Sequence, residues 1–334
     1  MSGIKSLRKL QFGRQADSDS GDAIPATTIW RGTGTLEDAR DLHYIDEDVG
    51  ILSGTDRTNT SSLGAKLSLD ATPGTYEQFP HILEMNIKAA TPASDSGGGS
   101  GYIYTYTIPT TAGNTVKPYS IQGGDNQQAE VANFMHGTDF TFAGEEKKEW
   151  MMSSNLFGRT VANTTFTPAL SLPTVYEANF GQTLLYIDDD SNTWGSTLKS
   201  NTLLQASLKY TSGLIPKFTA DGQLYFSFVQ TTMPKIELTL TFEHDAGSVT
   251  EKTNWKNETP RLIRLLNQGP ALTTPGLYTY RSIIIDLAGK WLKFAKIGNR
   301  NGNDILEGTF TGRYNATQAS SGQIVVVNEL SSLP

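Results

Sequence analysis

The 334-residue chain contains no cysteine, which excludes disulfides, thiolate metal sites and thiol nucleophiles. Its four histidines show no spacing such as H-x-x-x-H that brings two imidazoles to one metal ion. No apolar run approaches the length of a membrane-spanning helix, and residues 4–10 are too short and too basic for a signal peptide. These absences predict a protein that is made soluble in the cytosol, needs no cofactor and makes no membrane contact.

Motifs for catalysis are also missing. No serine lies in a G-x-S-x-G turn, and Gly32 and Gly34 lack the third glycine and the preceding apolar strand of a dinucleotide site. Glu243 and Asp245 flank His244, but neighbours along a strand point to opposite faces and so make no ready acid/base pair. The sequence therefore predicts a structural or binding protein and not an enzyme.

One acidic segment resembles the start of a calcium loop. Asp188, Asp190 and Asn192 offer oxygen ligands at alternate positions. Thr193 stands where such a loop needs glycine, and Lys199 stands where it needs a bidentate glutamate. A polar turn is the better interpretation.

Charge is unevenly distributed along the chain. The net charge is −7, whereas residues 1–15 carry Lys5, Arg8, Lys9 and Arg14 with no acid, so the remainder carries −11. An acidic body argues against recognition of nucleic acid, which requires lysine and arginine clustered against phosphates. Contact with DNA without binding is still compatible with this charge.

An acidic stretch follows the basic N-terminal segment closely. Only Arg40 interrupts its six acids, which are Glu37, Asp38, Asp41, Asp46, Glu47 and Asp48. An exposed tail and a solvated loop are one interpretation. The other is that the two segments attract each other, within one subunit or between subunits.

A strand followed by a tight break and a helix occurs twice. In residues 65–70 apolar and polar side chains alternate, and Pro73 and Gly74 end that strand. Thr75 and Gln78 have the spacing of a capping box, which predicts a short helix with its apolar side on Phe79, Ile82, Leu83, Met85 and Ile87. We expect His81, at the helix start, to be a surface residue.

The second copy lies in residues 235–255. Apolar side chains alternate with polar ones over residues 236–242, and Ser248 with Glu251 has the spacing of a second capping box. Gly158-Arg159 and Gly312-Arg313 occur at corresponding places after the two helices. We interpret this as an internal repeat.

The remaining chain alternates short strands with turns rich in glycine and proline, including an Asp221-Gly222 hairpin signal. This pattern predicts a mainly β fold of two tandem β-sandwich or barrel domains, each with one flanking helix. The predicted units are an arm over residues 1–27 with a hinge at 17–22, domains over 28–162 and 181–334, and a connector over 163–180. One domain with an elaborated second half is the alternative.

The order of several motifs resembles the major tail tube proteins of phages with long, non-contractile tails. After the basic arm come IWRGTGTLEDARD at residues 29–41 and TPGTYEQFPHILEMNIK at 72–88. FTPALSLPTVYEANFG at 166–181, LYIDD at 185–189 and IDLAGKW at 285–291 follow. The resemblance spans nearly the whole chain and rests on the order of these motifs.

The resemblance implies a virion protein that assembles in the host cytoplasm. Tube proteins of this kind close six β domains into a ring, so a two-domain chain would form a pseudo-hexameric ring of three subunits. Rings stack into a tube that holds the tape-measure protein, joins tail tip and terminator proteins, and passes DNA. The ten charged residues of the arm and the acidic stretch are then candidate contacts between rings.

Two alternatives stay open at this point. A tail terminator or baseplate-proximal ring protein would share the fold and form a single ring. A carbohydrate-binding β-sandwich would use Tyr102, Tyr104 and Tyr106, which alternate along one strand and share a face, as a sugar platform.

Overall fold

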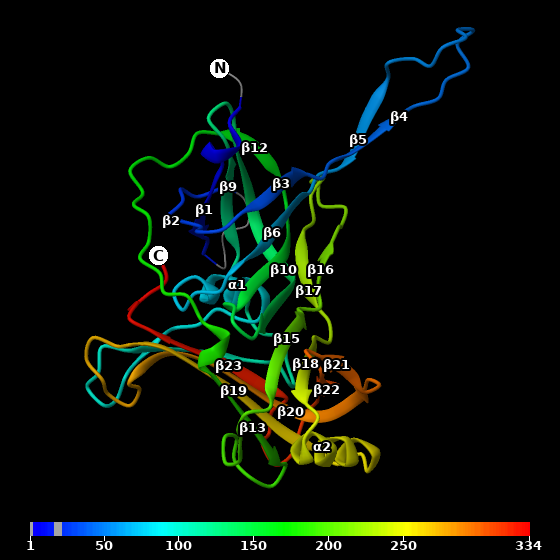
Figure 1. The fold of residues 1–334 in the computed structure, drawn as a ribbon. Helices are drawn as coiled ribbons and strands as arrows, with labels where there is room; N and C mark the ends of the chain where they lie inside the picture. The colour runs from blue at the N-terminus through cyan, green and yellow to red at the C-terminus, as the bar shows by residue number, and fades with distance from the viewer. Residues whose placement is uncertain (1–2, 17–21) are drawn as a thin grey trace.

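The computed structural model describes residues 3–16 and 22–334 (Figure 1). The fold is mainly β and antiparallel, as predicted. After a short 3-10 helix η1 (Lys5–Leu7), the first half contains β1 (Lys9–Arg14), β2 (Thr28–Ile29), β3 (Gly34–Asp38), β4 (Asp41–Tyr44), β5 (Thr58–Ser62), β6 (Ala65–Pro73), α1 (Phe79–Asn86), β7 (Ala93–Ser94), β8 (Tyr102–Thr107), β9 (Tyr119–Gly124), β10 (Ala129–Glu145), β11 (Met151–Gly158) and β12 (Val161–Thr164).

The second half begins with η2 (Phe180–Gln182). It continues with β13 (Thr183–Asp189), β14 (Leu198–Lys199), β15 (Leu203–Thr211), β16 (Leu214–Lys217), β17 (Phe228–Thr231), β18 (Lys235–Glu243), α2 (Ala246–Lys256), β19 (Arg261–Ala271), β20 (Tyr280–Phe294), β21 (Gly298–Arg300), β22 (Asn303–Gly312) and β23 (Gly322–Asn328).

Strand pairing repeats between the halves. In the first half the order is β2-β1-β9-β10-β11-β6-β3, and β12 also pairs with β10. In the second half it is β14-β13-β19-β20-β22-β18-β15, and β23 also pairs with β20. A hairpin precedes β6 and β18 and a helix follows each. The internal repeat predicted from the sequence is thus present in the pairing.

The two halves are joined edge to edge and share one core. β10 pairs with β15, and β8 pairs with β23. One hydrophobic cluster includes buried residues of both halves, such as Phe140, Leu208 and Ile285. The division into separate domains at residues 162 and 181 stays a prediction.

Helix α1 forms where expected, but its surroundings differ from the prediction. All eight of its residues are buried, and His81 is 1% exposed, so the prediction of a surface histidine was wrong. The capping box does not close either. Thr75 Oγ1 accepts the Gln78 N–H at 3.2 Å, whereas the Gln78 amide donates to the Ile29 carbonyl and accepts the Arg31 N–H.

Helix α2 starts earlier than expected. Its N-cap is Asp245, whose carboxylate accepts the Ser248 N–H at 2.7 Å, while the Ser248 hydroxyl accepts the Asp245 N–H. Glu251 therefore has no capping role, and its carboxylate binds Arg261. A stronger cap three residues upstream displaced the predicted one.

The N-terminal arm and one hairpin also need correction. Residues 9–14 form β1 between β2 and β9, with Leu10 and Phe12 buried, and so belong to the body. The predicted hinge lies largely outside the described residues, since 17–21 are not described. The predicted hairpin at Asp221-Gly222 is present, since β16 and β17 pair antiparallel, but its loop is longer than a tight turn because β16 ends at Lys217 and β17 starts at Phe228.

Candidate assembly surfaces

The junction between the halves is a seven-residue antiparallel ladder. Residues 139–145 of β10 pair with residues 205–211 of β15. Phe140, Phe142 and Leu208 at this ladder are 0% exposed, and the rings of Phe140 and Tyr210 stack at 5.4 Å. The junction is built like a protein core and holds the halves together through apolar burial and main-chain hydrogen bonds.

A turn of the first half fills the space beside this ladder. Trp150 follows β10 and stacks on Phe142 at 4.5 Å, and its indole N–H donates to Thr183 Oγ1 at 2.9 Å. Its ring also lies 5.2 Å from that of Phe180 in η2, whose N–H donates to the Lys148 carbonyl at 3.0 Å. The turn over residues 145–150 therefore occupies the space between η2, β13 and β15.

The corresponding strands at the two ends of the sheet lack such partners. The pairings run from β3 through β6, β11, β10, β15, β18 and β22 to β20 without returning to β3. Among the described residues, β3 pairs with β6 alone, and residues 290–294 of β20 pair with β22 alone. Leu36 on β3 and Phe294 on β20 are only partly buried. Unpaired edges of this kind favour pairing with another chain.

A groove of about 730 Å³ opens beside the free edge of β3. Residues of η1, β1, β3 and the β9–β10 turn line it. Lys5, Arg8 and Lys9 contribute its positive charge, and Asp125 and Glu130 contribute negative charge. Three of the four basic residues singled out from the sequence therefore gather at one site.

Arg14 does not belong to this surface. Its guanidinium makes a bidentate ion pair with the fully buried Glu84, with both N–O distances 2.9 Å. Tyr119 donates to the same carboxylate at 2.9 Å and also contacts His81 Nδ1. Although burial opposes it, the charges of Tyr119 and Glu84 raise the pKa of Arg14. Arg14 anchors β1 to α1 within the subunit.

The acidic residues lie apart from the groove or at its edge. Glu37 and Asp38 are on β3, and Asp38 pairs with Arg40. Asp41, Asp46, Glu47 and Asp48 lie in the β4–β5 hairpin, which projects away from the body (Figure 1). Among the described residues no ion pair joins the basic arm to these acids.

The tip of the β4–β5 hairpin carries exposed apolar side chains that were not predicted from the sequence. Val49, Ile51 and Leu52 are 52%, 62% and 107% exposed, and Leu42 and Tyr44 are exposed along β4. Apolar residues within an acidic stretch of the sequence were the available signal. An apolar tip on a projecting hairpin is typical of a contact surface.

One face of the long sheet forms a polar wall. A row across the sheet contains Thr35, Ser68, Asn155, Asp139 and Thr211, each opposite the next in register. Each is exposed or half-buried. The wall carries hydroxyl and amide groups together with charges of both signs, such as Lys66 and Glu237.

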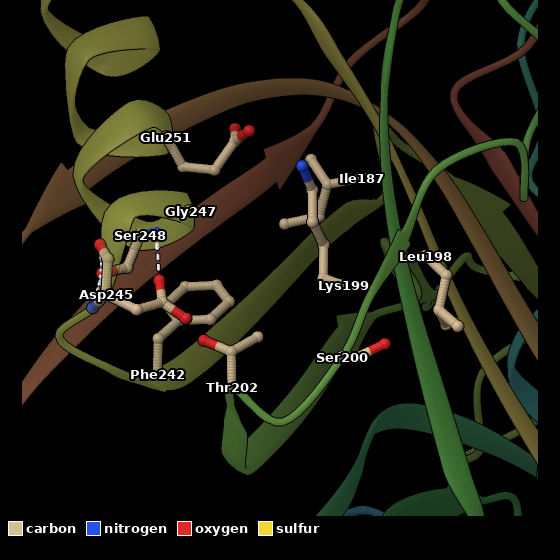
Figure 2. Close-up of a pocket in the computed structure, with 10 residues that line it drawn as sticks. All are labelled: Ile187, Leu198, Lys199, Ser200, Thr202, Phe242, Asp245, Gly247, Ser248 and Glu251. Atoms are coloured by element: carbon tan, nitrogen blue, oxygen red, sulfur yellow. Dashed lines mark hydrogen bonds between the residues drawn. The ribbon is translucent and has the colours of Figure 1, made fainter.

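A smaller cavity of about 180 Å³ lies at the start of α2 (Figure 2). Glu251 and Ser248 line it from the helix, Lys199 lines it from β14, and Thr202 lines it from the segment between β14 and β15. Both oxygens of Glu251 accept hydrogen bonds from Arg261, and the carboxylate of Asp245, which also lines the cavity, accepts the Ser248 N–H, so both carboxylates make structural contacts.

Two other predicted sites have structural roles. Asp188 accepts the N–H groups of Gly195, Ser196 and Thr197 at 2.9, 3.1 and 2.6 Å and so fixes a polar turn. Tyr104 and Tyr106 are 0% exposed and pack against α1, so the proposed sugar platform was wrong. No group of three potential metal ligands occurs in residues 3–16 and 22–334.

Comparison with models of protein families and with curated proteins gives no match to this chain. In the described part of the chain, no helix is long and apolar enough to cross a membrane.

Proposed function

We propose that this chain is a structural protein of a virion, which closes into rings and stacks as the tail tube of a long-tailed phage. One observation carries the proposal. The chain contains two copies of one unit, joined through a sheet edge, and leaves the same two edges free at its ends. Repeating the internal junction between subunits removes both free edges and closes a ring.

The dimensions support a channel. The sheet path from β3 to β20 has eight strands, so three copies would give 24. At a spacing of about 4.8 Å this gives a barrel with a backbone diameter of about 37 Å, and strand tilt widens it further. The polar wall would line the channel, and the acidic body would let DNA slide through without binding.

Stacking would use the projecting parts of the chain. The β4–β5 hairpin, with its apolar tip and acidic residues, projects out of the body (Figure 1) and would contact a neighbouring ring. The tape-measure protein would occupy the channel, and tip and terminator proteins would bind the ends of the stack. Reversing Lys5, Arg8 and Lys9 to glutamate should shorten tubes if the arm helps to join rings; unchanged tube lengths would contradict that role.

Negative-stain electron microscopy of the purified, concentrated protein tests the proposal. Hollow tubes or stacked rings with threefold symmetry are the expected result. Rings that never stack would favour a terminator or baseplate-proximal protein instead. A monomer at every concentration, also in the presence of tail-tip complexes, would contradict a tube-forming role.

A further inference from the structure

The ends of β10 and β20 can be aligned through a shared irregularity. The β10–β11 ladder shifts register between Gly137 and Asp139, and the β20–β22 ladder shifts between Trp291 and Lys293. Both shifts insert one residue into the longer strand. Lys293 in the second half therefore corresponds to Asp139 in the first.

The edges of β3 and β15 can be aligned in the same way. Glu37 lies opposite Lys66, and Lys209 lies opposite Glu237. Lys66 and Glu237 in turn lie opposite the residue that precedes each Gly-Arg pair. Glu37 on the free edge therefore corresponds to Lys209 at the internal junction.

These two alignments place opposite charges together. At the internal junction, Asp139 and Lys209 lie on one face of adjacent strands, one diagonal step apart. Superposing that junction on the free ends brings Lys293 of one subunit to the same relation with Glu37 of the next. This pair again joins opposite charges, but the positive residue now lies on β20 and the negative residue on β3. Both residues are exposed in the single chain.

The groove beside β3 fits the turn that follows β20. At the internal junction, the turn after β10 fills the space bounded by η2, β13 and β15. The equivalent space in the first half is bounded by η1, β1 and β3, and it is the 730 Å³ groove. The equivalent turn is residues 295–303; Lys296 and Ile297 at its start are exposed, whereas Arg300 ion-pairs with Glu146 of the same chain at 3.4 Å.

We infer that a second copy of this chain docks head to tail on the β3 edge, with its Ala295 opposite Glu37, its Lys293 paired with Glu37 on the diagonal, and its Lys296 and Ile297 at the groove. Ring closure in this inference rests on the proposed function, whereas the strand register between subunits is taken from the internal junction alone. The indole of Trp255 donates to the Leu292 carbonyl at 3.3 Å, so pairing with the second copy starts at Lys293.

Charge reversal and rescue test the inference. Glu37→Lys and Lys293→Glu alone should each weaken self-association at least about fivefold, as judged by sedimentation, since each places like charges across the ladder. The double variant should recover wild-type association. Asp190→Lys, a reversal in the turn after β13 and away from both ends, should have no effect.

The outcomes separate the register from the function. Single variants that assemble like wild type, or a double variant that stays dissociated, would overturn the inferred contact. If tubes still form in those variants, the proposed tube function is retained and only the inferred register is contradicted. A wild-type chain that never associates would overturn both.

Discussion

The helices α1 and α2 hold the same place in the two repeats and differ in what covers them. α1 is buried along its whole length and packs against β10 of its own half and against β8, which pairs with β23 of the second half. In α2 only Ser248 and Glu251 are buried, and Val249 is 46% exposed. The following unit buries the first helix, and within one chain the second helix has no following unit.

Truncating one side chain in each helix should give the largest difference between the two repeats in the free energy of unfolding. Ile82→Ala removes a side chain that is 0% exposed, so the free energy of unfolding should fall by about 2–5 kcal/mol. Val249→Ala in α2 should change it by less than about 0.5 kcal/mol in the dilute monomer. Denaturant unfolding measures both. Equal effects would mean that α2 is covered as well as α1.

Acid should weaken the first half more than the second. Burial, together with the charge of Arg159, lowers the pKa of His136 from 6.5 to about 3. The folded state then binds fewer protons than the unfolded state. The contribution of neutral His136 to the free energy of unfolding is therefore fully present above pH 6.5 and is lost as the pH falls toward 3. Burial and Arg14 lower the pKa of His81 to about 3 in the same way.

His136→Phe isolates this effect. Among the described residues neither His136 nitrogen has a hydrogen-bond partner, and the ring lies between Phe134 and Phe157. The variant should gain about 2 kcal/mol over wild type between pH 7 and pH 5. Burial raises the pKa of Glu77 to about 7, so Glu77 has the opposite effect on stability as the pH falls. This effect is the same in wild type and in the variant. A constant difference across this range would contradict the assigned protonation.

Loss of a helix cap should matter more for α2 than for α1. Asp245→Ala removes the carboxylate that accepts the Ser248 N–H and should cost about 1 kcal/mol. In the part of the chain that the structure describes, helix α1 has no side-chain cap at Gln78 and is held by packing. Thermal unfolding should therefore show a smaller loss for Thr75→Ala. A larger loss would indicate that the Thr75 turn fixes α1.

The smallest effect on stability is expected at the free hairpin. Leu52→Ser changes a fully exposed side chain, so the free energy of unfolding should stay within about 0.5 kcal/mol of wild type. Stacking of rings should nevertheless decrease, because the apolar tip is lost. Electron microscopy of the variant would show rings in place of tubes. Normal tubes would assign stacking to other residues.

Local patterns predicted much of the fold. Alternation and turn residues located β6 and β18, and helix signals located α1 and α2. They could not predict burial of His81, because its environment is supplied by Tyr119 and Arg14 from distant strands. For the same reason Tyr104 and Tyr106 could be assigned to one face, but not to the core.

The candidate site was predicted only in part. The charges of Lys5, Arg8 and Lys9 were evident in the sequence, whereas the groove they line needs the register of β1, β3 and β9. Arg14 looked like the other three, but its position opposite Tyr119 places it beside Glu84. Free edges are a property of the complete pairing order and leave no local signal.

Cysteine cross-linking tests the central claim most directly, because the chain has no cysteine of its own. In Glu37→Cys/Ala295→Cys the two Cα atoms should lie about 4.5–5.5 Å apart across subunits, within the range of a disulfide. Thr141→Cys/Lys209→Cys, opposite each other at the internal junction, provides the intrachain control. Mild oxidation should convert the first variant into covalent dimers and trimers and leave the control monomeric. A first variant that stays monomeric while the control closes its disulfide would contradict head-to-tail pairing of β20 with β3.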